Sequence, residues 1–172
     1  LAGDNPPEFL LTHPVTSSRV SDALNAADQI EFSGGKKNTI NFEFVKGRLK
    51  ARYASSSPQA SVRYFEQLSK ESSSNENKYA YLTALQATGD FKKALMVVNE
   101  LLSKYPKNLI LNITKSEIYL SNQELDKAKM QIEKVLKISP GNYPASIIKS
   151  NILSAQNKTI QAEEIVRELL LS

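Results

Sequence analysis

His13 is the single histidine of the 172-residue chain, which has no cysteine. A protein-only zinc site needs several histidine, cysteine or acidic ligands, as in the HExxH helix of metallopeptidases, and that motif is absent. A catalytic triad is not indicated either, because no G-x-S-x-G or comparable nucleophile motif accompanies His13. We therefore predict that this chain by itself contains no catalytic residue and holds no cofactor.

Two other classes of site are disfavoured by the sequence. Ser33-Gly34-Gly35-Lys36 does not match the G-x-x-x-x-G-K-[ST] loop that cradles phosphates. The net charge of +4 comes from lysines scattered among glutamates, which is typical of solvated helix faces and not of a nucleic-acid interface. No run of 18 apolar residues occurs, so we expect no membrane span.

The chain contains an internal repeat of 34 residues. An alanine returns at this interval at Ala60, Ala94, Ala128 and Ala162, and a leucine follows each at Leu68, Leu102, Leu136 and Leu170. This period is the signature of the tetratricopeptide repeat, a helix-turn-helix unit that stacks into a solenoid. The predicted fold class is an all-α tetratricopeptide-repeat solenoid of about four repeats, preceded by an N-terminal loop and one extra helix.

We expect two regions along the chain. Residues 1–38 would hold the histidine-containing loop, a helix over 16–30 and a polar linker. Residues 39–172 would form the repeat domain, with repeats over about 40–73, 75–107, 109–141 and 143–172. Because the sequence begins at Leu1, we expect a fragment or a processed form of a longer protein.

The repeat predicts which residues pack and which bind. The small alanines would let the two helices of a unit cross closely, while Tyr64, Val98, Ile132 and Val166 would face the neighbouring repeat. The first helices of the units would line a concave, partner-binding face, with Tyr53 and Tyr79 as amphipathic anchors. The residues predicted for this face are Arg52, Tyr53, Tyr79, Thr83, Gln86, Ile113, Glu117 and Asn151.

Two alternatives for this face remain open at this stage. The same side chains would equally well fill space between helices. A third hypothesis, the carboxylate clamp of cytosolic chaperone adaptors, is disfavoured because the set is too apolar and too mixed in charge.

The N-terminal segment PEFLLTHPVTSSRVSDALNAA, from Pro7 to Ala27, resembles a known family. It is similar to the segment that follows the catalytic core in the beta-barrel assembly-enhancing protease family. These are periplasmic zinc metallopeptidases of the HExxH class with a C-terminal tetratricopeptide domain. The second repeat, YAYLTALQATGDFKKAL, resembles the first well-formed repeat of the family, and the resemblance covers almost the whole chain.

The resemblance implies a regulatory and protein-binding role in the periplasm. The HExxH motif would lie upstream of residue 1, and His13, in the Thr12-His13-Pro14 loop, would be an extra ligand of the parent protein's zinc that holds the protease shut. The repeat domain would dock on its own protease domain. It would also engage outer-membrane barrel proteins or their assembly machinery, as a chaperone or a protease in quality control.

An alternative is a free-standing tetratricopeptide adaptor or lipoprotein of the outer-membrane assembly machinery, with no protease and an incidental His13. The sequence upstream of Leu1 discriminates the two hypotheses. An HExxH helix there would support the protease, and a short lipoprotein signal would support the adaptor.

Overall fold

A computed structural model describes residues 39–53, 57–72 and 74–171. The predicted histidine loop, the predicted helix over 16–30 and the linker lie outside these residues. Eight helices make up the described part, and we number them from α2. They are α2 (Ile40–Tyr53), α3 (Pro58–Glu71), α4 (Asn75–Ala87), α5 (Phe91–Lys104), α6 (Leu109–Ser121), α7 (Leu125–Ile138), α8 (Tyr143–Ala155) and α9 (Thr159–Leu171).

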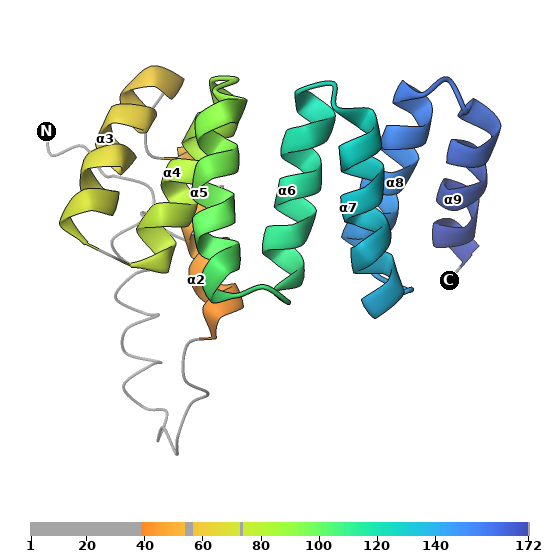
Figure 1. Cartoon of the computed structure of the whole chain (residues 1–172), viewed down its shortest axis with the longest axis horizontal. Helices are drawn as coiled ribbons and strands as arrows, with labels where there is room; N and C mark the ends of the chain where they lie inside the picture. The colour runs from red at the N-terminus through yellow and green to blue at the C-terminus, as the bar shows by residue number, and fades with distance from the viewer. Residues whose placement is uncertain (1–38, 54–56, 73, 172) are drawn as a thin grey trace, which may run out of the picture. The chain divides into compact units, whose positions relative to one another are not determined.

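Helices α4 to α9 form a regular array in which each helix packs on the next one along the chain. Figure 1 shows them standing side by side and joined by short turns. No strand occurs among the described residues. The prediction of an all-α helical repeat solenoid is therefore confirmed. None of these helices combines the length and apolar content of a membrane span.

Capping and turn residues recur at the repeat interval. The side chains of Asn108 and Asn142 each accept a hydrogen bond from a backbone amide three residues on, at Leu111 and Ala145, which starts α6 and α8. Within each of the last three units, the turn contains one residue with a left-handed backbone. These residues are Gly89 (φ 75°), Gln123 (φ 60°) and Asn157 (φ 61°).

The repeated alanines lie where the prediction places them in the last three units. Ala94, Ala128 and Ala162 are at most 3% exposed. The hydroxyl of Ser116 donates to the carbonyl oxygen of Ala128 at 2.8 Å, and Ser150 does the same to Ala162 at 3.0 Å. A small residue on one helix and an alanine on the other thus allow the close crossing that a repeat unit needs.

The first unit departs from this register. Its second helix, α3, buries Ser61 and Phe65, whereas Ala60 is only half-buried and Tyr64 is 56% exposed. The reason is that α3 begins 33 residues before α5, while α5, α7 and α9 begin 34 residues apart. The expectations that Ala60 marks the helix crossing and that Tyr64 faces the next repeat are therefore wrong by one position.

The last unit also differs from the expectation. Val98 and Ile132 are buried as predicted, but Val166 is 39% exposed and Leu170 is 81% exposed. Both lie on α9, which packs on α8 and on no other helix of the described part to a comparable extent. The predicted packing of Val166 against a following repeat is thus incomplete here.

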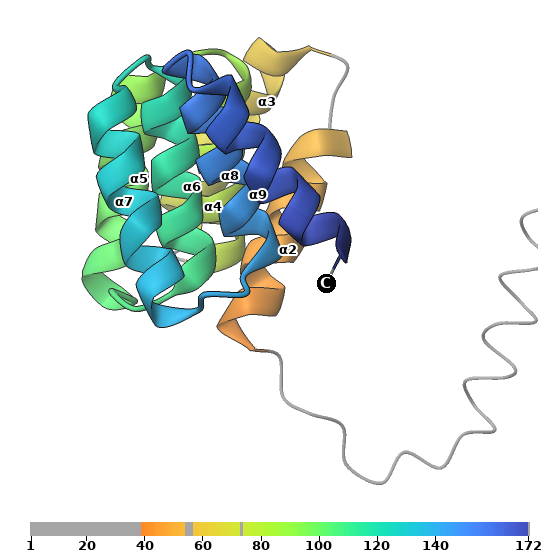
Figure 2. The ribbon, with the colours of Figure 1, turned by 90° about the vertical axis from the view of Figure 1, so that its right-hand side faces the viewer.

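Helix α2 packs mainly on α4, and α3 packs separately on α4. In Figure 2, α2 lies on the opposite side of α4, α6 and α8 from α5 and α7. This is the side formed by the first helices of the units, for which partner binding was predicted. The candidate site is therefore built around α2.

Candidate functional site on the α4–α6 face

Gly47 allows α2 to cross α4 at very short range. A Cβ atom at this position would overlap the carbonyl oxygen of Glu76 and lie 3.1 Å from the amide nitrogen of Ala80. Glycine in the middle of a helix is unfavourable by roughly 0.5–1 kcal/mol relative to alanine, so its presence needs a packing reason. The close backbone contact with α4 supplies that reason.

An aromatic cluster anchors the N-terminal half of α2. Phe44 is fully buried, with its ring centroid 5.1 Å from that of Tyr79 and 6.0 Å, edge-on, from that of Tyr105. Asn75, the first residue of α4, donates to Tyr105 at 3.2 Å and to the carboxylate of Glu43 at 3.1 Å. Ring contacts of this kind are worth about 0.5–1.5 kcal/mol beyond the area buried.

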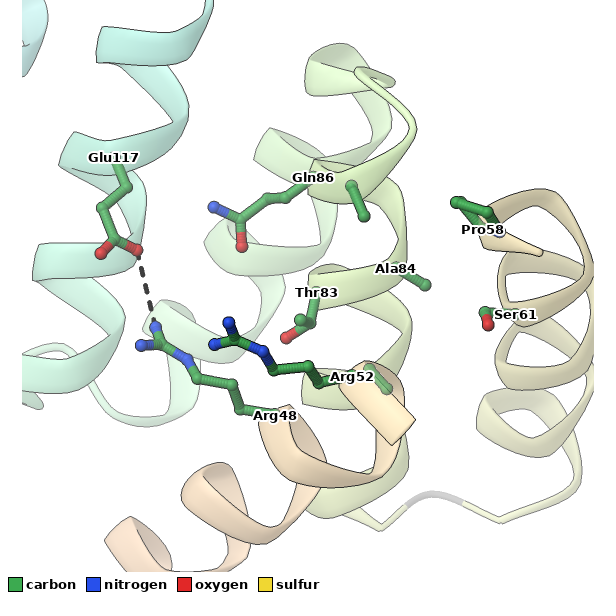
Figure 3. Close-up of a pocket in the computed structure, with 10 residues that line it drawn as sticks. Arg48, Arg52, Pro58, Ser61, Thr83, Ala84, Gln86 and Glu117 are labelled. Carbon is green, nitrogen blue, oxygen red and sulfur yellow. Dashed lines mark ion pairs between the residues drawn. The ribbon is translucent and has the colours of Figure 1, made fainter. Parts of the chain in front are cut away.

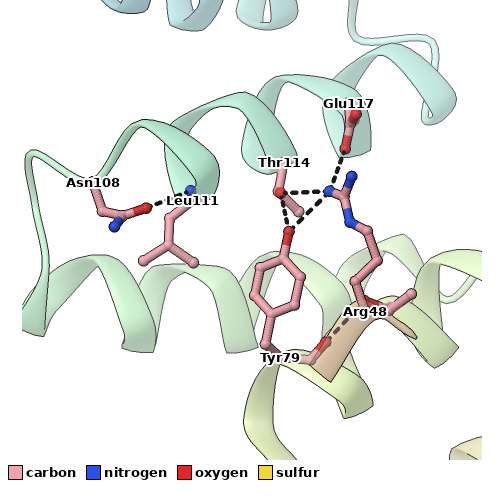
Figure 4. Close-up of polar contacts among 7 residues, drawn as sticks. Arg48, Tyr79, Asn108, Leu111, Thr114 and Glu117 are labelled. Carbon is pink, nitrogen blue, oxygen red and sulfur yellow. Dashed lines mark hydrogen bonds and ion pairs between the residues drawn. The ribbon is translucent and has the colours of Figure 1, made fainter. Parts of the chain in front are cut away.

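Arg48 connects three helices through one nitrogen atom. Its Nη2 donates to the Tyr79 hydroxyl at 2.9 Å and to the Thr114 hydroxyl at 3.4 Å, and it lies 3.5 Å from a carboxylate oxygen of Glu117. The Tyr79 and Thr114 hydroxyls are themselves 2.7 Å apart. Figure 4 shows these groups converging between α2, α4 and α6. The network fixes the side chain of Tyr79 beneath α2.

Burial shapes the electrostatics of this network. It raises the pKa of the Glu117 carboxyl above its ordinary value, and the charge of Arg48 opposes part of that rise. Burial also raises the pKa of Tyr79, against the opposing effects of Arg48 and the Thr114 hydrogen bond. Tyr79 therefore stays protonated at neutral pH and can act in the network as a neutral hydroxyl.

A second set of polar contacts ties α2 along its edge. Lys46 lies 3.1 Å from the carboxylate of Glu76 on α4, and Lys50 pairs with the same carboxylate. Desolvation by burial pushes the pKa of Glu76 upward, but the two lysines outweigh it and hold that pKa below its ordinary value. At the other end, Asn108 donates to Asn41 at 2.7 Å.

A cavity of about 370 Å³ opens between α2, α3, α4 and α6. Four of the predicted partner-binding residues line it, namely Arg52, Thr83, Gln86 and Glu117. In Figure 3, Arg48 and Arg52 from α2 and Glu117 from α6 lie near Thr83 and Gln86 of α4, and Ala84 and Pro58 lie farther along the same wall. Arg52 is exposed and makes no ion pair within the described ranges. The cavity therefore offers one uncommitted cation to an incoming group.

A smaller and more apolar cavity of about 160 Å³ lies beside the Arg48 network. Its walls are Phe44, Val45, Arg48, Tyr79, Ile110, Ile113, Glu117 and Pro144. Tyr79 is 1% exposed and Ile113 is 8% exposed. The structure thus places these two predicted anchors within the packing between helices, as the space-filling alternative expects.

The other predicted positions lie apart from the larger cavity. Tyr53 ends α2 and is 79% exposed, and it lines a separate hollow with Tyr64. Asn151 is exposed on α8. His13 lies outside the described residues. Within those residues, no three histidine, cysteine, aspartate or glutamate side chains gather in a way that could hold a metal.

Gly47 and Arg48 were missed by the sequence reasoning although a signal was present. A glycine inside an otherwise good helical segment, followed by an arginine, indicates a close helix crossing with a charged group at its edge. The 34-residue period drew attention to Arg52 instead. The first unit is displaced from that period, so the residue that reaches Glu117 is Arg48.

Comparison with known proteins gives one distant relationship. No family model matches the chain. The chain is 27% identical over 161 residues to the Beta-barrel assembly-enhancing protease of Yersinia pestis. The match covers 84% of this chain and 33% of that protein, so the chain spans about a third of the length of its relative. Over most of its residues the chain is thus distantly related to that protease.

Proposed function

We propose that the helical array is the protein-binding tetratricopeptide domain of a zinc metallopeptidase of the beta-barrel assembly-enhancing type. This protein would act in the periplasm on outer-membrane barrel proteins or their assembly machinery. The observation that supports the proposal most is the similarity to the Yersinia pestis protease over 84% of the chain. The helical repeat supports it as well, because such arrays present extended binding surfaces.

The cavity between α2, α3, α4 and α6 is the proposed contact for a client segment. It combines Arg52 with the amide of Gln86 and the hydroxyl of Thr83, beside an apolar wall that includes Ala84 and Pro58. Such a set suits a polar or acidic group attached to a small apolar side chain. Catalysis would reside elsewhere in the parent protein, in the part that this chain lacks.

Photo-crosslinking in the parent protein tests the proposal. A crosslinking residue at Gln86, in the cavity, should capture outer-membrane barrel proteins or components of their assembly machinery. The matched control is Met96, which is 66% exposed on α5 and lies outside the cavity. Failure to crosslink any such protein from Gln86, or equal yields at both positions, would contradict the proposal.

The proposed role of His13 has a separate test. By resemblance, His13 is an extra zinc ligand that keeps the parent protease shut, and zinc would be held by ligands of the protease domain. The variant His13→Ala in the intact parent protein should therefore raise proteolysis of an unfolded substrate. Unchanged or lower proteolysis would count against a regulatory loop while leaving the binding role of the array untouched.

A further inference from the structure

The outward face of α2 presents a row of exposed apolar side chains. Phe42, Val45, Leu49 and Tyr53 are 51%, 48%, 51% and 79% exposed. Their spacing of three, four and four residues places them on one side of the helix. The opposite side bears Phe44 and packs on α4. Helix α2 is thus apolar on two sides, and within the described part of the chain only one of them is covered.

Cations border this row on both sides. Helical geometry places Lys46 and Lys50 along one edge and Arg48 and Arg52 along the other. The side chains of Lys46, Arg48 and Lys50 are 50%, 46% and 48% exposed even though each pairs with an acid of α4 or α6. Glu43 is the one acidic residue of α2. The border of the row is therefore strongly positive.

A hollow lies at each end of the row. Val45 belongs to the cavity of about 160 Å³. Tyr53 belongs to another of about 310 Å³, which is lined by Lys50, Tyr53, Tyr64, Phe65 and Leu68. Val45 and Tyr53 are eight residues apart, or about 12 Å at a rise of 1.5 Å per residue. On a partner helix the same distance separates residues seven or eight positions apart.

We propose that this face of α2 docks an amphipathic helix of a partner protein whose apolar stripe is bordered by aspartates and glutamates. Two apolar side chains of that helix, seven or eight positions apart, would enter the two hollows, and its acids would face the cations of α2. The proposal rests on the protein-binding function proposed above, because it names a surface and a class of partner for that function.

An anionic lipid surface is the other occupant that such a row of apolar and basic residues attracts. The partner helix is favoured for two reasons. The hollows at Val45 and Tyr53 are of a size that admits individual side chains. In addition, Lys46, Lys50 and Arg48 are held close to the helix by Glu76 and Glu117, whereas lipid binding favours cations that extend freely to headgroups.

Peptide binding to the full 172-residue chain tests the inference. The probe is a fluorescent helical peptide of about 18 residues, long enough to form a helix, with leucines along one face and glutamates beside them. A matched peptide carries lysines in place of the glutamates. Leu49→Glu should weaken binding of the acidic peptide by about tenfold, the loss typical of a central interface residue. Leu49→Ala should weaken it less, and Met96→Glu on α5 should leave it unchanged.

Several outcomes would overturn the inference. One is equal affinity for the two peptides, and another is acidic-peptide binding that Leu49→Glu leaves intact. A third is binding to phosphatidylglycerol vesicles, with no peptide binding, that Leu49→Glu abolishes, since this result would assign the face to lipid. If the peptide fails while Gln86 still crosslinks assembly proteins, the α2 face alone is refuted. Failure of both would refute the proposed function as well.

Discussion

Tyr79 shows how a single hydroxyl connects helices that are distant in sequence. Its oxygen lies 2.7 Å from the Thr114 hydroxyl on α6 and accepts a hydrogen bond from Arg48 on α2. Thr114 is fully buried, so loss of its partner would leave a buried polar group under-satisfied. The stability of the α2–α4–α6 contact therefore depends on a group that sequence alone presents as a surface anchor.

Replacing Tyr79 by phenylalanine should lower the free energy of unfolding by about 1–2 kcal/mol, because both hydrogen bonds are lost with little change in packing. Urea denaturation followed by circular dichroism measures the change. The matched control is Tyr53→Phe at a site that is 79% exposed, where we expect a change within about 0.5 kcal/mol. Equal effects at the two tyrosines would refute the role of the Tyr79 hydroxyl.

Glu76 should make stability depend on acidic pH. Its folded-state pKa lies below the ordinary value of 4.5, so the unfolded state binds the proton more readily. The stabilisation is then present above about pH 4.5 and is lost as pH falls through the folded pKa. Urea midpoints measured from pH 6 down to pH 3 should fall less steeply in Glu76→Gln than in the wild type. A slope that the substitution leaves unchanged would be the contrary result.

Among the helix contacts, the crossing of α2 over α4 has the least tolerance. Gly47→Ala should push the two backbones apart and lower the free energy of unfolding by about 1–3 kcal/mol. It should also raise the amide exchange rates of α2. Gly141→Ala is the matched control, because a Cβ atom there meets no atom within 4 Å. A Gly47→Ala protein as stable as the Gly141→Ala protein would show that α2 is not closely packed.

Helix identity and most helix ends could be predicted from the 34-residue period. The period works for α4 to α9 because one turn length and one linker length recur in those units. In the first unit the turn between α2 and α3 is one residue longer, and the link from α3 to α4 is one residue shorter. These changes nearly cancel. Ala60 therefore still falls on the 34-residue period although Ser61 occupies the crossing.

The candidate site was predicted in part. Thr83, Gln86 and Glu117 were identified from their places on the first helices of the units, and the structure brings them together with Arg52 at one cavity. The burial of Tyr79 was not foreseeable in this way. It depends on α2 lying against α4, and a repeat pattern describes how units stack but not which face an irregular first helix covers.

The molecule as a whole is a linear array in which each unit is stabilised by its neighbours. Central helices such as α6 and α7 pack on helices at both sides, whereas α9 packs mainly on α8. Leu170 and Leu171, on α9, are 81% and 82% exposed. The end of the array should therefore open more easily than its centre.

Hydrogen exchange of the 172-residue chain should show this gradient. We expect the amides of α9 to be the least protected of the last three units and those of α6 and α7 to be the most protected. Truncation after Ser154 should leave the protection of α4 and α5 nearly unchanged, because their neighbours remain. Uniform protection from α4 to α9 would instead indicate all-or-none unfolding of the array.

The constant interval between units also bears on how such a chain can change in length. Residues 109–142 run from the start of α6 to the cap of α8, and a duplicate inserted after Asn142 would meet surfaces like those that α6 and α7 already meet. Gene duplication could thus add a helical pair without inventing a contact. Only the irregular first unit, where α2 is locked across α4, has no interchangeable counterpart.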